Sequence, residues 1–219
     1  EPMIGVIFAD RPGGHMSSFY HGAFEGIIEE AMIANARLLV SRYDVRSDPE
    51  ACYRSLAMAG ADGFVVLGSL AAPQLLRLLL EADARFLCIG KRTLPDAELS
   101  WVSSDYLRGS QEAVEHLIGL GHRRIALVVS ENQEAEWNVE RIQGYQVALA
   151  SRGLEPGPRW IVRNTEELAA LLARDEWRRS GVTAAFAISY FCASSLLAAC
   201  GIAGVSVPEE MAVVGFDDP

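Results

Sequence analysis

Two kinds of hydrophobic pattern alternate along the chain. Short apolar runs are typical of strands buried in a parallel sheet, and longer stretches with apolar residues at a helical period indicate helices that cover such a sheet. The predicted strands are 3–9, 37–41, 63–68, 85–90, 100–103, 125–129, 160–162, 184–188 and 212–216. The predicted helices are 17–34, 49–60, 73–82, 105–120, 136–151, 165–174 and 191–203.

Several of the predicted helices carry clear boundary signals. Asp48 followed by Pro49 is typical of a helix start, and Gly60 is expected to stop that helix. Asp105 is expected to cap the helix that follows it, and Gly121 to end that helix in a left-handed turn.

Repeated strand–helix–strand units of this size predict parallel sheets with helices on both faces. The pattern restarts near Asp105, so we predict an α/β fold of two doubly wound parallel-sheet lobes that meet at a cleft. Their expected extents are 1–104 for the N-terminal lobe and 105–219 for the C-terminal lobe.

Composition excludes several classes of protein. The chain has 219 residues, half of them hydrophobic, and a formal net charge of −10. Duplex DNA is bound through clustered Lys and Arg, and the basic stretches at 123–124 and 178–179 are no longer than pairs. We therefore expect that these 219 residues do not bind nucleic acid themselves. No apolar run approaches the roughly 18 residues of a membrane span, so no membrane contact is expected.

The sequence carries no recognised catalytic or metal-binding motif. Its four cysteines form no C-x-x-C pair, and its four histidines have no metal-ligand spacing. Phosphate-binding, zinc-protease and nucleophile-elbow motifs are also missing. We expect no catalytic residue, no metal and no cofactor, and the scattered cysteines fit a reducing cytoplasm.

The last predicted strand leads directly into two carboxylates, Asp217 and Asp218. In open α/β sheets, ligands bind just beyond the carboxyl ends of the strands. Paired acids at this place are suited to hydroxyl donors, so Asp217 is a candidate ligand contact. Asp218 is better explained as a turn cap.

Motifs spread over nearly the whole chain resemble one family. They are Asp48-Pro49-Glu50, Ala61-Asp62-Gly63, Leu120-Gly121-His122-Arg123-Arg124-Ile125-Ala126, Arg141-x-x-Gly144-Tyr145-x-x-Ala148-Leu149, and Val207-Pro208-Glu209-Glu210 through Gly215-Phe216-Asp217-Asp218. In this order they resemble the effector domain of lactose-repressor (LacI/GalR) type bacterial transcription regulators.

The resemblance implies a periplasmic-binding-protein-like fold of type I and a cytoplasmic protein. A helix-turn-helix headpiece is expected to precede Glu1 and to make all contact with DNA. The family pattern also continues beyond Pro219, so the C-terminal return segment that completes both lobes is expected to be missing from this stretch.

The resemblance also implies a set of ligand-binding residues. Arg141 and Asp217 match the family arginine and acid that contact the ligand, and Phe19 and Tyr20 match the aromatic pair at the start of the first helix. The remaining candidates are Trp137, in the loop lining the C-terminal lobe, together with Lys91, Ser189 and Tyr190. The alternative is a structural role: Arg141 as a surface cation, Trp137 as rim packing, and one ring of the aromatic pair as a contact between helix and sheet.

Three departures from the family pattern bear on the ligand. Ser17-Ser18 replaces Asn-Pro, Ser189-Tyr190 replaces Asn-Asp, and Lys91 replaces an acid. If Lys91 and Arg141 both face the cleft, the pocket is more positive than one for a neutral sugar. The hypothesis is a ligand with an anionic group, such as a sugar phosphate or sugar acid, or a planar ring stacked on an aromatic side chain.

Two helices are candidates for a two-fold homodimer interface. The helix at 73–82 carries leucines on more than one side, and the helix at 191–203 has no charged residue. Both match dimer-forming positions of the family, although burial within one subunit would account for part of each. The predicted function is therefore that of a ligand-sensing, dimerising domain, with a periplasmic sugar-binding protein as the main alternative and an α/β enzyme as the less favoured one.

Overall fold

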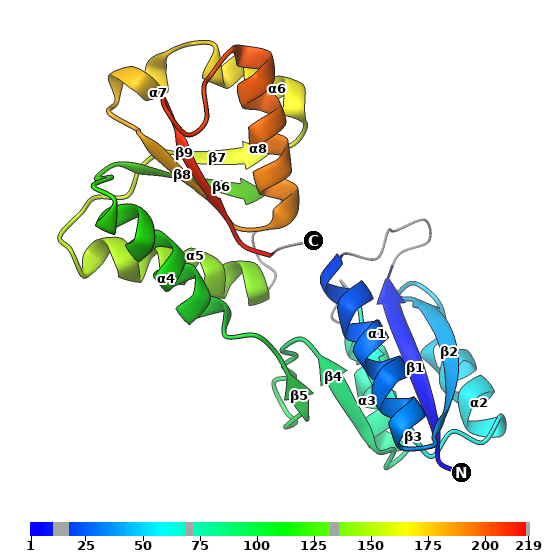
Figure 1. Cartoon of the computed structure of the whole chain (residues 1–219). Coiled ribbons are helices and arrows are strands. Elements are labelled where there is room, and N and C mark those ends of the chain that lie inside the picture. The colour runs from blue at the N-terminus through cyan, green and yellow to red at the C-terminus, as the bar shows by residue number, and fades with distance from the viewer. Residues whose placement is uncertain (11–17, 69–71, 132–135, 218–219) are drawn as a thin grey trace. The chain divides into compact units, whose positions relative to one another are not determined.

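A computed structural model describes residues 1–10, 18–68, 72–131 and 136–217. The chain divides into two compact units, Glu1–Ser104 and Asp105–Pro219. Each unit is an α/β layer structure with its own sheet (Figure 1). The prediction of two parallel-sheet α/β lobes is confirmed.

The first unit contains a five-stranded sheet in the order β2-β1-β3-β4-β5, and every pairing between these strands is parallel. Its strands are β1 (Met3–Asp10), β2 (Arg37–Asp44), β3 (Gly63–Leu67), β4 (Phe86–Ile89) and β5 (Trp101–Val102). Its helices are α1 (Ser18–Ile33), α2 (Pro49–Met58) and α3 (Pro73–Glu81).

Helices pack against both faces of this sheet (Figure 1). On one side, Leu75, Leu76 and Leu79 of α3 are at most 1% exposed and join the core with Ile7 of β1. On the other side, Phe24 of α1 packs edge-on against Phe8, with ring centroids 5.1 Å apart. Three of the α3 leucines are therefore buried within the unit, and they account for part of the apolar surface that the sequence assigned to this helix.

The second unit contains a four-stranded parallel sheet in the order β7-β6-β8-β9. Its strands are β6 (Ile125–Ser130), β7 (Arg159–Val162), β8 (Ala184–Ala187) and β9 (Ala212–Gly215). Its helices are α4 (Tyr106–Gly119), α5 (Glu136–Ala150), α6 (Thr165–Leu172), α7 (Glu176–Arg179) and α8 (Tyr190–Ala203). Helices α4 and α5 pair on one face, and α6 and α8 pair on the other (Figure 1).

The predicted helix boundaries are confirmed where capping side chains were expected. Asp48 Oδ1 accepts a hydrogen bond from the Glu50 N–H at 3.0 Å, and Asp105 Oδ1 accepts one from the Arg108 N–H at 3.0 Å. Gly121 has a φ of +100°, which is the left-handed turn expected after α4. The short helix α7 was not predicted, because four residues are too few for a helical period to show; it is anchored by Trp177, which is 3% exposed.

The pair α4 and α5 is held at a close backbone contact. A Cβ atom at Gly144 would stand 2.3 Å from the Leu107 carbonyl oxygen and 2.7 Å from Ser110 Cβ, so only glycine fits there. Next to it, the Tyr145 hydroxyl donates to the Ile125 carbonyl at 2.8 Å and accepts from the Gly157 N–H at 2.9 Å. These contacts fix α5 on the sheet, and α5 is the helix that carries Arg141.

Strand order changes direction between β1 and β3 in the first unit and between β6 and β8 in the second. Such a switch point opens a crevice outside the carboxyl ends of the strands, where ligands of open α/β sheets bind. The residues that follow β3 in the first unit and β8 in the second therefore stand at the expected places for ligand contacts, and those that follow β4 and β9 lie one strand further along the same edges.

Candidate functional site

Arg141 is a buried cation at the carboxyl edge of the second sheet. It projects from α5, and the residue is 5% exposed. Its Nη1 donates to the Ile188 carbonyl oxygen just past β8 at 2.7 Å, and its Nη2 donates to Asp217 Oδ1 just past β9 at 3.0 Å. The guanidinium therefore connects a helix to two strand ends, which excludes the alternative of a surface cation.

Two aromatic rings hold the guanidinium plane. Arg141 Cζ lies 4.0 Å from the ring centroid of Phe216 and 4.8 Å from that of Tyr106. The two rings are tilted against each other with centroids 5.9 Å apart. Because cation–π contacts strengthen when desolvated, this arrangement helps to hold a charge that burial would otherwise destabilise.

The acid in this pair stands in an unusual backbone conformation. Asp217 has a φ of +71°, in the left-handed region that Asp tolerates better than most residues. The Phe216 N–H bonds the Ala187 carbonyl at 3.0 Å, which continues the β8–β9 pairing up to the turn. Asp217 Oδ1 faces Arg141. Because the Asp217 side chain is still 22% exposed, its carboxylate also remains accessible to a ligand.

Arg141 also has an unused donor. Its Nε is buried and has no hydrogen-bond partner in the described part of the chain. A buried polar group without a partner is costly, and such groups are often satisfied by a ligand or an ordered water. The Nε–H group is therefore a candidate ligand contact that neither Ile188 nor Asp217 occupies.

Sequence reasoning missed the two rings of this site and a buried polar residue on the same helix as Arg141. Asn138 is 5% exposed and lies three residues before Arg141 on the same helix, and Tyr106 and Phe216 form the two rings beside the guanidinium. The spacing of Asn138 and Arg141 places both side chains on one helix face and could have indicated the first of these. No local pattern connects Tyr106 with Phe216, because their proximity depends on the packing of α4 against β9.

Three further candidates lie at helix starts in the second unit. Ser189 is the N-cap of α8, and its Oγ accepts a hydrogen bond from the Cys192 N–H at 3.3 Å. Tyr190 follows it and is 46% exposed. Trp137 lies in the first turn of α5, within the predicted helix 136–151 and not in the loop that the resemblance implied, and it is partly buried.

In the first unit, Arg92 is buried in a similar way after β4. It is 4% exposed, and its Nη2 donates to the Gly68 carbonyl just past β3 at 2.7 Å, while its Nη1 donates to the Lys91 carbonyl at 2.8 Å. A Cβ at Gly90 would stand 3.1 Å from Arg92 Nη1 and 3.7 Å from the Tyr20 hydroxyl oxygen. Tyr20 and Arg92 thus come together at the carboxyl edge of this sheet.

Lys91 lies beside the same strand end. Its Nζ is 5.9 Å from the ring centroid of Trp101, a cation–π contact across β4 and β5. The backbone of Phe19 belongs to α1, but its side chain lies outside the described part of the structure, as does all of Asp218. The structure thus groups Arg141, Asp217, Ser189, Tyr190 and Trp137 in one unit, and Tyr20 and Lys91 in the other.

Cysteine and metal chemistry find no support among the described residues. Burial raises the pKa of the Cys192 thiol, against smaller opposing effects of Ser189 and Arg141, and burial raises the pKa of Cys88 to about 11. Both thiols therefore stay protonated at neutral pH and are poor nucleophiles. Within residues 1–10, 18–68, 72–131 and 136–217, no group of His, Cys, Asp or Glu could hold a metal ion, and no helix could span a membrane.

Comparison with known sequences first gives the class of protein. The family model described as periplasmic binding protein-like domain matches residues 114–219. Among curated relatives, the HTH-type transcriptional regulator CelR of Thermobifida fusca is 32% identical over 74% of this chain and 49% of its own length. The HTH-type transcriptional regulator DegA of Bacillus subtilis is 26% identical over 91% of this chain and 60% of its own length.

Solved structures that resemble this chain are also transcription regulators. A regulatory protein of the LacI family from Chloroflexus aggregans superposes with a TM-score of 0.84 at 27% identity, covering 99% of this chain and 78% of that one. The transcriptional regulator CelR–cellobiose complex gives a TM-score of 0.81 at 27% identity, covering 99% of this chain and 67% of that one. The chain is a periplasmic-binding-protein-like α/β domain.

More narrowly, the similar curated proteins and solved structures are LacI-family regulators, and the chain matches the part of them that has the periplasmic-binding-protein-like fold. The resemblance identified from the sequence motifs is confirmed. The chain spans about half the length of CelR and somewhat more of DegA.

Proposed function

We propose that this chain senses a small molecule for a dimeric transcription regulator, and that effector binding changes the affinity of the whole protein for DNA. The observation that carries the proposal is the buried Arg141–Asp217 pair at the carboxyl edge of the second sheet. A guanidinium and a carboxylate together offer donors and acceptors for hydroxyl-rich ligands. A periplasmic sugar-binding protein is not favoured, because the relatives are regulators.

Each unit offers candidate ligand contacts of its own. Asp217 would accept ligand hydroxyls, the Nε–H of Arg141 would donate to a ligand oxygen, and Tyr190 and Trp137 offer aromatic surface nearby in the same unit. In the first unit, Tyr20 and Lys91 would contact the effector, and Phe19 remains a candidate from the sequence. Ser189 would act mainly as a helix cap, since its Oγ already accepts a backbone hydrogen bond.

We infer that the effector carries an anionic group. Lys91 adds a cation beside the buried Arg92, at a strand end where the family pattern has an acid. CelR has been solved with cellobiose, a neutral sugar, so this chain would differ from that relative in the charge of its ligand. A sugar phosphate or sugar acid fits this inference.

Regulation would follow from a difference in effector affinity between two conformations. A ligand shifts such an equilibrium only by its differential affinity for the two states. We propose that DNA is contacted by a part of the whole protein other than these residues, that the protein acts in the cytoplasm where the DNA lies, and that it performs no catalysis.

The proposal is tested by thermal melting of the chain with matched pairs of neutral and phosphorylated sugars. Mass action predicts stabilisation that grows with ligand concentration for a compound that binds only the folded state. We expect a phosphorylated or acidic sugar to raise the melting temperature more than its neutral counterpart, and Lys91→Gln to remove the difference. Stabilisation by neutral hexoses alone would contradict the anionic ligand.

A further inference from the structure

A polar pocket lies at the opposite edge of the second sheet from the Arg141–Asp217 pair. It encloses about 370 Å³ and is lined by Glu115, Ile118 and Gly119 of α4, by Arg123 just before β6, and by Arg152 and Leu154 after α5. Pockets for small molecules hold roughly 300–1,000 Å³, so this hollow has the size of a small organic ligand. None of its lining residues belongs to the site already described.

The hollow is formed by the ends of two helices. After α4, the Gly121 N–H bonds the Ile118 carbonyl at 3.0 Å and the His122 N–H bonds the Leu117 carbonyl at 3.1 Å. After α5, the Leu154 N–H bonds the Leu149 carbonyl at 3.0 Å, and Gly153 has a φ of +64°. Both helices thus end in left-handed glycine turns that satisfy their last carbonyls and leave a hollow between them.

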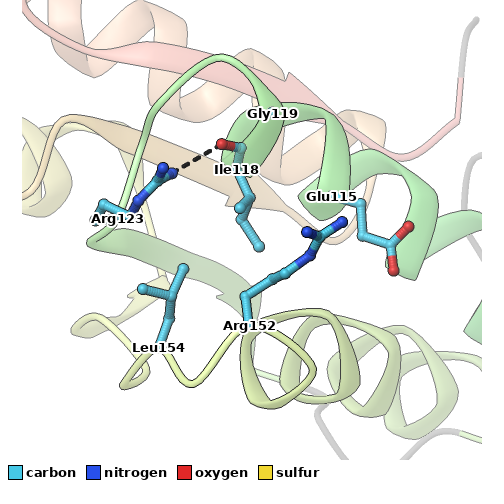
Figure 2. A pocket seen from close by; sticks show the side chains of 6 residues that line it. All are labelled: Glu115, Ile118, Gly119, Arg123, Arg152 and Leu154. Carbon is cyan, nitrogen blue, oxygen red and sulfur yellow. Dashed lines mark hydrogen bonds between the residues drawn. The ribbon is translucent and has the colours of Figure 1, made fainter.

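Two guanidiniums reach into the hollow from different segments (Figure 2). Arg123 uses Nη1 to donate to the carbonyls of Ile118, at 2.8 Å, and His122, at 3.1 Å. The backbone N–H of Arg152 donates to the Leu149 carbonyl at 3.0 Å, but in the part of the chain that the structure describes its guanidinium makes no hydrogen bond or ion pair. Its guanidinium has five donors, all of them available to a ligand.

Glu115 supplies the opposite chemistry in the same pocket. Its Oε1 accepts a hydrogen bond from Gln111 at 2.7 Å, which holds the side chain in place and leaves the other carboxylate oxygen as an acceptor. The two arginines and one glutamate leave a net positive charge in this pocket, within a chain whose formal net charge is −10. Ile118 and Leu154 add apolar walls for a short carbon chain.

We propose that this pocket binds a small organic acid that carries hydroxyl groups. Its carboxylate would lie between Arg123 and Arg152, because guanidinium forks match carboxylates in two-point hydrogen bonding. One of its hydroxyls would donate to Glu115, and its carbon chain would contact Ile118 and Leu154. A hydroxy acid has a carboxylate for the two arginines and hydroxyl donors for the single glutamate.

The test uses three compounds of equal chain length: gluconate, sorbitol, which has no carboxylate, and hexanoate, which has no hydroxyl groups. They are titrated at constant ionic strength into the chain labelled with 15N-arginine, and the Nε–Hε signal of Arg152 is followed after assignment with Arg152→Gln. Gluconate is expected to shift this signal to saturation. Sorbitol and hexanoate should bind roughly tenfold or more weakly, since each loses hydrogen bonds to a charged group.

Single substitutions test whether gluconate binds in this pocket. Arg123→Gln should weaken gluconate binding roughly tenfold or more, because one charged hydrogen-bonding partner is lost. Glu115→Ala should reduce the preference for gluconate over hexanoate. Arg174→Gln, which removes an exposed arginine of the same unit outside the pocket, is the matched control, and Lys91→Gln tests independence from the proposed effector site; neither should change the titration.

A shift of the Arg152 signal that does not saturate would overturn the proposal. So would equal binding of gluconate and hexanoate, or equal weakening by Arg123→Gln and Arg174→Gln. If Lys91→Gln alone abolished the shift, gluconate would be acting through the effector site, and the pocket proposal would be wrong while the proposed function stood.

Discussion

Arg141 and Asp217 are 76 positions apart in the sequence, and the fold brings the guanidinium Nη2 to 3.0 Å from the carboxylate Oδ1. The same guanidinium donates to the Ile188 carbonyl, so three segments of the second unit meet at one side chain. Arg92 makes the equivalent backbone contact in the first unit, with the carbonyl just past β3. Each sheet thus has a buried arginine bound to the carbonyl that follows the strand at its switch point.

Removing the Arg141 guanidinium should destabilise the second unit. Arg141→Met leaves the partly buried Asp217 without its partner and the Ile188 carbonyl without its donor, which should cost about 2–4 kcal/mol in the free energy of unfolding. Urea denaturation measures this loss. Arg163→Met is the control, because its ion pair with Glu131 joins two well-exposed side chains and should contribute less than about 1 kcal/mol. Similar losses in both variants would contradict a structural role of the buried pair.

The contact between α4 and α5 should tolerate no side chain at position 144. Gly144→Ala places a methyl group 2.3 Å from the Leu107 carbonyl oxygen, and we expect a loss of roughly 1–3 kcal/mol in unfolding free energy. Gly119→Ala, on α4 with open space around it, should be neutral or stabilising by up to about 1 kcal/mol. Equal unfolding midpoints for the two variants would show that the helices separate more easily than the structure implies.

Glu210 should make the stability of the second unit depend on pH. The Ser206 N–H and Arg178 hold the pKa of this carboxyl below its ordinary value of 4.5. Because the folded-state pKa is the lower one, the contribution is complete above the unfolded-state pKa and is lost as the pH falls through the folded-state pKa. Glu210→Gln should therefore lower the melting temperature at neutral pH, and the difference from the parent protein should close in acid. Glu209→Gln is the neighbouring control and should leave the melting temperature at neutral pH unchanged.

The outer face of α8 should carry the proposed dimer contact. Phe191, Leu197 and Ile202 are 55%, 48% and 65% exposed, and α8 contains no charged residue. Ile202→Glu would place a charge in an apolar interface, so sedimentation velocity should show a dimer for the parent protein and a monomer for the variant. Met58→Glu on α2 replaces another exposed side chain, 82% accessible, and should leave the dimer intact. A dimer that survives Ile202→Glu would exclude this face.

Sequence patterns predicted most of the fold because their signals are local. The apolar runs marked the strands, and caps such as Asp48 and Asp105 marked helix starts within one turn. The site was harder to predict from the sequence, because its residues come from segments that are far apart along the chain. The acid at position 217 could be placed from its strand end, but the rings of Tyr106 and Phe216 around Arg141 follow from packing that no local pattern records.

The central claim is that the Asp217 carboxylate, held by Arg141, contacts the effector. The most direct measurement is isothermal titration calorimetry of the parent chain and of Asp217→Asn with the sugar or sugar phosphate that most stabilises the parent protein. Asp217→Asn keeps the size and one acceptor of the side chain, and it should weaken binding by roughly tenfold or more through the loss of a charged hydrogen bond. Unchanged affinity in a folded Asp217→Asn variant would contradict the account, since the effector would then bind without the acid at the end of β9.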